Sequence, residues 1–224
     1  CRVLIPHRVE VLHPVVPVAN FVVIGLCVLM FLGQMGFLLE LNEAFVLTSW
    51  NPIELLFSSL VHADLFHLIF NMWYLWVFGN AICAVFGNAK FLGIFFAGAL
   101  VSAITHLILD GNPAVGASGA INTIIGVFLA LYPVNRIHCL YFFWVKAGSF
   151  SIQAYWLIAF WFICDIFGVI SGSGGTAFWA HIGGFVFGIG IGIAALSGGW
   201  VALSKYDNET LLDIINKKER ISRY

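Results

Sequence analysis

A serine and a histidine, in two separate glycine-rich segments, have the chemistry needed for acyl transfer. Ser118 lies in the stretch VGASGAINTIIG and His181 in AHIGGFVFGIGIG. A serine hydroxyl becomes a nucleophile when a histidine accepts its proton, and a helix N-terminus favours the oxyanion that then forms. His67 and Asn71 are four residues apart, so they share one face of a helix. Together with the Ser118 backbone N–H, they could bind that oxyanion.

These residues belong to a strongly apolar chain. Of its 224 residues, 61% are hydrophobic and 9% are charged, and the mean hydropathy is +0.99. A segment that crosses about 30 Å of hydrocarbon needs roughly 20 apolar residues. The sequence therefore predicts an all-α polytopic membrane protein, in which residues 1–16 form a cytoplasmic N-terminal segment and 198–224 a cytoplasmic tail with a short surface helix. Between them, residues 17–197 form the membrane domain, with six transmembrane helices near 17–39, 63–86, 90–109, 117–133, 150–170 and 177–197.

The charged residues separate by side under this six-helix topology. Every basic residue falls on the side that holds both termini, namely Arg2, Arg8, Lys90, Arg136, Lys146, Lys205, Lys217, Lys218, Arg220 and Arg223. The other side carries only acids, namely Glu40, Glu43, Glu54, Asp64 and Asp110. Basic residues concentrate on the cytoplasmic side of membrane proteins, so we predict that both termini are cytoplasmic. Topology explains the Lys and Arg residues, so no nucleic-acid partner is expected.

The candidate reactive groups are expected at one depth. His67 and Asn71 begin the second helix, Ser118 begins the fourth and His181 begins the sixth, all on the outer side. Polar side chains in a bilayer usually face a bundle interior or a water-filled cavity. The fourth helix has only about 15 residues, or about 22 Å, which is shorter than the hydrocarbon core. We therefore predict a wet cavity open to the outside, with Ser118 at its floor.

Helix packing should bring the serine and the histidine together. Gly184, Gly188 and Gly192 recur every four residues after His181, which lets another helix approach closely. A Ser118–His181 hydrogen bond requires such an approach of the fourth and sixth helices. We see no carboxylate placed to orient His181 and expect a dyad. Asp165, near the outer end of the fifth helix, is the only intramembrane acid that could make this a triad, but we expect it to make a structural polar contact or to take part in gating.

Three motifs resemble the rhomboid family of intramembrane serine proteases. They are HADLFHLIFNMWYLWVFG from His62, GASGA from Gly116 and AHIGG from Ala180, in this order on helices two, four and six. The resemblance extends from Pro17 to Leu196.

The resemblance implies the simpler, bacterial form of a rhomboid bundle with a short fourth helix. It implies Ser118 as nucleophile, His181 as general base, and His67 and Asn71 as oxyanion-hole or substrate-polarising groups. It implies a multi-pass protein of the bacterial inner membrane that cleaves membrane-spanning proteins without a metal or other cofactor. Because a spanning substrate must leave its helix to reach Ser118, and this costs least where the cavity offers water, we expect the cut near the outer surface. Asn122 departs from the family pattern, because relatives often have an aromatic residue there that stacks on the histidine.

Other functions fit parts of this pattern. A six-helix transporter would have a polar cavity, but transport favours polar groups at several depths. A zinc protease could use His62, His67 and His181, yet the H-E-x-x-H motif is absent and His62 is poorly placed on the helical face of His67. We expect a structural role for His62. A catalytically inactive, rhomboid-like membrane chaperone is the remaining alternative.

The segment CLYFFWVKAG from Cys139 is too short to span the membrane, and we expect an aromatic linker at the membrane interface.

Overall fold

The computed structural model describes residues 3–11, 16–35, 45–143, 146–201, 203 and 209–221. Of the residues used above, Arg2, Glu40, Glu43, Lys205, Arg223 and the last residues of the first expected span lie outside this part of the chain. Within it, five spans are long and apolar enough to cross a membrane: α1 (Val18–Met35), Leu65–Phe86, α6 (Asn88–Leu109), α8 (Ala154–Ser171) and α9 (Phe178–Ser197).

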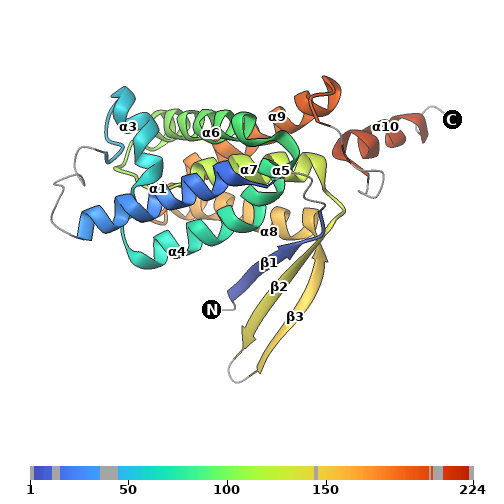
Figure 1. Ribbon diagram of the computed structural model, residues 1–224, viewed down its shortest axis with the longest axis horizontal. Coiled ribbons are helices and arrows are strands. Elements are labelled where there is room, and N and C mark those ends of the chain that lie inside the picture. The colour runs from blue at the N-terminus through green and yellow to red at the C-terminus, as the bar shows by residue number, and fades with distance from the viewer. Residues whose placement is uncertain are drawn as a thin grey trace.

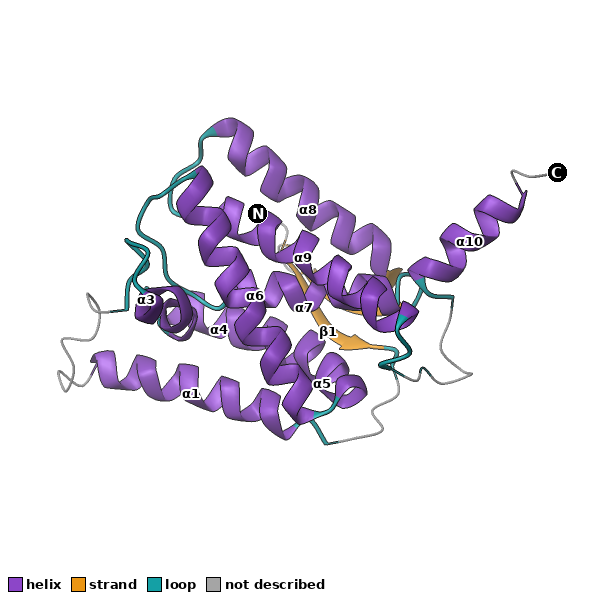
Figure 2. Cartoon of the chain, turned by 90° about the horizontal axis from the view of Figure 1, so that it is seen from above, coloured by secondary structure: helices purple, strands orange, loops and turns teal. Residues whose placement is uncertain are grey.

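A sixth apolar helix, α7 (Ser118–Leu131), is shorter than the other five and lies in the middle of the bundle (Figure 2). Almost all of its residues from Gly119 to Leu131 are buried. Its 14 residues correspond to about 21 Å of helix. The predicted helical membrane bundle with a short fourth helix is therefore confirmed.

Glycines hold α7 against α9. A side chain at Gly184 would meet the carbonyl oxygen of Gly119, and one at Gly188 would meet that of Thr123. On the facing helix, a side chain at Gly126 would meet the backbone of Phe185. The backbones thus approach too closely for any larger residue at these positions, as the spacing of the α9 glycines predicts.

The second span changes helix type halfway. It consists of α4 (Leu65–Tyr74), the π-helical turn η2 (Leu75–Gly79) and α5 (Asn80–Phe86). Asn20 of α1 is fully buried. Its Nδ2 atom donates hydrogen bonds to the Leu75 carbonyl at 2.8 Å and to Asn80 Oδ1 at 2.7 Å. Gly79 leaves room for this amide, because a Cβ there would lie 2.5 Å from Asn20 Oδ1. The side chain of Asn20 therefore satisfies backbone that the π-turn alters.

A three-stranded antiparallel sheet accompanies the bundle, with strand order β1 (Val3–Val9), β2 (Arg136–Phe143) and β3 (Lys146–Gln153). It lies beside the helices in Figure 1. The predicted aromatic linker from Cys139 is wrong, because most of that segment is strand. Ile137 and Cys139 are buried, while Arg136 is exposed and His138 and Leu140 are only partly buried, which is the alternation of a half-buried strand.

The two ends of the bundle differ in what they carry. The short helices α3 (Pro52–Phe57) and η1 (Ser58–Leu60) lie at one end, and α10 (Leu211–Ile221) projects beyond the other (Figures 1 and 2). Thr210 precedes α10, and Asp213 accepts hydrogen bonds from its N–H and its hydroxyl. On the α10 side, Lys90 donates to the carbonyl oxygen of Trp200. The direction of the bundle in the membrane remains a prediction from the charges.

Candidate active site

Ser118 is the first residue of α7. The preceding residue, Ala117, provides no side-chain cap, so the N–H groups of the first turn have no side-chain partner there. The N–H groups of the first helical turn also have no partner inside a helix, and the helix dipole favours negative charge at this end. The Ser118 hydroxyl therefore lies beside a site suited to an oxyanion.

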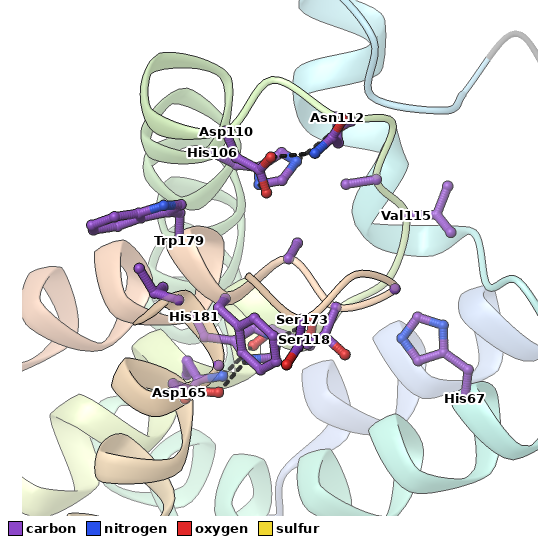
Figure 3. Close-up of a pocket in the computed structure, with 18 of the residues that line it drawn as sticks. His67, His106, Asp110, Asn112, Val115, Ser118, Asp165, Ser173, Trp179 and His181 are labelled. Carbon is purple, nitrogen blue, oxygen red and sulfur yellow. Dashed lines mark hydrogen bonds and ion pairs between the residues drawn. The ribbon is translucent and has the colours of Figure 1, made fainter. Parts of the chain in front are cut away.

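His181 lies between two helices that come from distant parts of the chain. Its Nε2 atom is 2.9 Å from Ser118 Oγ, and its Nδ1 atom is 3.0 Å from Asp165 Oδ1 of α8. Figure 3 shows the ring between these two partners. The side chains of His181 and Asp165 are only 14% and 16% exposed. The expectation that no carboxylate orients His181 is thus corrected, because both ring nitrogens have partners.

The similar depth of Asp165 and His181, though not their bond, could have been found from the sequence. The helices α8 and α9 are consecutive and are joined by residues 172–177. Two antiparallel helices with a short connection place residues at similar distances from the loop at similar depth. Asp165 lies seven residues before the loop and His181 four residues after it, so one helical turn separates their expected depths.

His67 and Asn71 both lie on α4. Asp64 caps this helix by accepting from the His67 N–H at 2.9 Å. The Asn71 side chain is buried and donates from Nδ2 to the His67 carbonyl at 2.9 Å. Gly116 passes beside them with a φ of +119°, and a Cβ there would lie 2.6 Å from His67 Cε1. The loop before Ser118 can therefore approach α4 only with glycine at this position.

One cavity of about 930 Å³ contains all four predicted site residues. Ser118, His181, His67 and Asn71 line it, and Asp165 lines it as well. The loops at residues 112–115 and 172–177 form part of its wall, at the end of the bundle opposite α10 (Figure 2). The structure therefore brings the four residues to one space, as their common depth predicts.

Other residues of this cavity were not predicted. His106 is buried, with Nε2 2.7 Å from the Asn112 carbonyl oxygen and Nδ1 3.7 Å from Asp110. Asp110 also accepts a hydrogen bond from the Asn112 side chain. These contacts fix the loop after α6.

Asn122, at the position of the expected stacking residue, instead donates from Nδ2 to the Ser118 carbonyl at 3.0 Å.

The segment before α4 supports His67 from outside the spans. His62 is 1% exposed, and its ring meets the His67 ring edge to face at a centroid distance of 5.2 Å. Burial, together with the nearby His67, lowers the pKa of His62 to about 4. His62 therefore packs as a neutral ring against His67.

Glu54 of α3 fixes the segment at Thr48 and Ser49. Its carboxylate accepts hydrogen bonds from the N–H and the hydroxyl of both residues at 2.8–3.0 Å. These bonds, above all that from the Thr48 N–H, hold the pKa of Glu54 below its usual value.

In the described part of the chain, no three His, Cys, Asp or Glu side chains are grouped as a metal ion would require.

Comparison with known proteins gives one family. The rhomboid domain model matches residues 49–198, which is more than half of the chain. The match begins shortly before α3 and ends just after α9. It therefore includes every residue of the candidate site.

Several curated relatives are similar over this region. Presenilin-associated rhomboid-like protein, mitochondrial, from Bos taurus is 30% identical over 142 residues, which are 60% of this chain and 36% of the relative. Rhomboid protease GluP from Bacillus subtilis is 30% identical over 135 residues, 54% of this chain and 26% of the relative. Rhomboid protein 1, mitochondrial, from Saccharomyces cerevisiae is 30% identical over 149 residues, which are 62% of this chain and 40% of the relative.

The chain thus spans about a quarter to two fifths of these relatives' own lengths. Two of the three are named mitochondrial, so the relatives do not support the bacterial inner membrane as the location. What they share with this chain is a multi-pass membrane domain.

Proposed function

Because the chain belongs to the rhomboid family, we propose that it is an intramembrane serine endopeptidase, with Ser118 as nucleophile and His181 as general base. The observation that carries this proposal is the 2.9 Å contact between Ser118 Oγ and His181 Nε2 inside the cavity. A nucleophile and its base within hydrogen-bond reach are the arrangement that acyl transfer requires.

The reaction begins with proton transfer. As Ser118 Oγ bonds to the peptide carbonyl carbon, its proton passes to His181 Nε2 and the carbonyl electron pair moves to the oxygen. The tetrahedral intermediate then collapses, the C–N bond breaks and the proton on Nε2 passes to the leaving amine. Water attacks the acyl-enzyme with the same histidine as base, which releases the carboxylate product and restores the Ser118 hydroxyl.

Three groups are available for the oxyanion. The Ser118 N–H lies at the start of α7, and Asn71 and His67 line the cavity from α4. Only one hydrogen of the Asn71 amide is used in the bond to the His67 carbonyl, so the second can reach the oxyanion. Each such donor stabilises charge that exists mainly in the transition state.

The substrates in this proposal are membrane-spanning proteins, and the lipid bilayer presents them. A spanning segment is helical, because unsatisfied backbone groups in lipid cost several kcal/mol each. The scissile bond must leave that helix before it reaches Ser118. The cost is lowest near the outer surface and beside residues such as glycine that weaken a helix. We therefore propose cleavage near the outer end of the span, between small residues. A particular organelle or bacterial membrane is not part of this proposal.

A fluorophosphonate probe tests the function directly. The purified protein in detergent should form a covalent adduct at Ser118, located by mass spectrometry of the proteolytic fragments. Ser118→Ala should remove the adduct, and His181→Ala should slow its formation by several orders of magnitude. A chelator such as EDTA should change neither result. An unlabelled wild-type protein would favour the inactive, chaperone-like alternative, and activity lost with EDTA and restored by zinc would favour a metalloprotease.

A further inference from the structure

Three carboxylates line the catalytic cavity, and they have different partners. Asp64 caps α4 through the His67 N–H, and Asp110 holds Asn112. Asp165 alone among these three contacts His181, at 3.0 Å from Nδ1. The carboxylate at Asp165 is therefore placed differently from the two that fix loop and helix ends.

The helix that carries Asp165 gives a second reason to single it out. Among the five long spans, α8 has the smallest buried share, and Ile163, Ile166 and Phe167 are all exposed on it. An ionisable group in a membrane span is costly and persists where it has a partner or faces a cavity. Asp165 has both, since it faces the cavity and bonds to His181 (Figure 3).

The contact also determines which nitrogen of His181 can act. A carboxylate only accepts hydrogen bonds, so Nδ1 must carry the proton in the bond to Asp165. The neutral ring then has its lone pair on Nε2, which faces Ser118 Oγ. After Nε2 takes the serine proton, both nitrogens are protonated and the ring is positive, and the negative carboxylate stabilises it.

No other contact of His181 in the described part of the chain selects its tautomer. The nearest ring, Phe178, meets His181 edge to face with centroids 6.3 Å apart and cannot select a tautomer. Asn122 on α7 bonds to the Ser118 carbonyl rather than to the imidazole. We infer that Asp165 is a positioning residue that holds the reactive tautomer of His181, so that three helices, α7, α8 and α9, form a Ser–His–Asp triad. This inference rests on the proposed function of Ser118 and His181.

The test compares Asp165→Asn and Asp165→Glu with Glu10→Gln as a matched control. Glu10 Oε1 also lies 2.8 Å from a histidine nitrogen, Nε2 of His138, but this pair is away from the cavity. We expect Asp165→Asn to lower kcat by roughly 10³-fold with little change in KM or thermal stability. The glutamate variant should recover a measurable part of this loss, and Glu10→Gln should keep the wild-type kcat.

A second measurement keeps the inference testable if the protein proves inactive. In ¹⁵N-histidine spectra of the full chain, with the His181 signals assigned by their loss in His181→Asn, His181 should be protonated at Nδ1 and not at Nε2. Asp165→Asn should abolish that preference. Wild-type kcat in Asp165→Asn, or an unchanged tautomer, would overturn the positioning role. An unlabelled wild type with the Asp165-dependent tautomer would instead overturn the proposed function alone.

Discussion

The Nε2 atom of His181 lies 2.9 Å from the hydroxyl oxygen of Ser118, although 63 residues separate them in the chain. Two glycine-rich helices make this possible. The N-terminal turns of α7 and α9 lie side by side because the backbones meet where Gly184 and Gly119 face each other. The geometry of the proposed nucleophile and base therefore depends on helix packing as much as on the two residues themselves.

Gly184→Leu should inactivate the protein, since the new side chain would collide with the Gly119 carbonyl and push α9 away from α7. Gly190→Leu on the same helix is the matched control, because no atom lies within 4 Å of a Cβ there. Fluorophosphonate labelling of both variants, normalised to folded protein, checks this. Equal labelling of the two would mean that close packing is not what aligns Ser118 with His181.

Asn71→Ala and His67→Ala should affect turnover more than substrate binding. Loss of one oxyanion donor typically lowers kcat by about 10²-fold, and less where neighbouring donors compensate. Steady-state kinetics with a membrane-spanning substrate would separate kcat from KM. Unchanged kcat with raised KM would reassign the two residues to substrate positioning.

Much of this arrangement can be predicted from sequence, because it depends on local patterns. The six apolar spans, the shortness of α7 and the small-residue face of α9 all follow from residue type and spacing. The strand β2 cannot, because its residues from Cys139 form an apolar, aromatic run without strict polar–apolar alternation, and one of its two partners, β1, lies more than 120 residues earlier. The bond from Asp165 to His181 depends on the relative rotation of α8 and α9, which polarity patterns do not specify.

Asn20→Leu should destabilise the bundle without touching the cavity. The variant would leave the Leu75 carbonyl without its side-chain donor and would place a bulky group against Gly79. An unsatisfied buried polar group costs about 1–3 kcal/mol, and overpacking costs a similar amount. Thermal unfolding in detergent measures the effect. A melting temperature equal to that of the wild type would show that the π-turn does not need this amide.

Acidification should weaken the fold through His62. Its pKa of about 4 in the folded protein lies below the ordinary value of 6.5, so between these pH values the unfolded chain binds a proton that the folded one does not. Stability contributed by the neutral ring is therefore present above pH 6.5 and is lost as the pH falls toward 4. The melting temperature should drop less between pH 7 and pH 5 in His62→Gln than in the wild type. An equal drop in both proteins would exclude His62 as the cause.

Cleavage of a defined single-span substrate in proteoliposomes tests the central claim most directly. The substrate carries small, helix-weakening residues near the outer end of its span, and the products are mapped by mass spectrometry. We predict that the wild-type protein cuts between small residues in that outer region and that Ser118→Ala, reconstituted at the same density, gives no product. Cleavage by the alanine variant at the wild-type rate, or a cut at the cytoplasmic end of the span, would contradict the account.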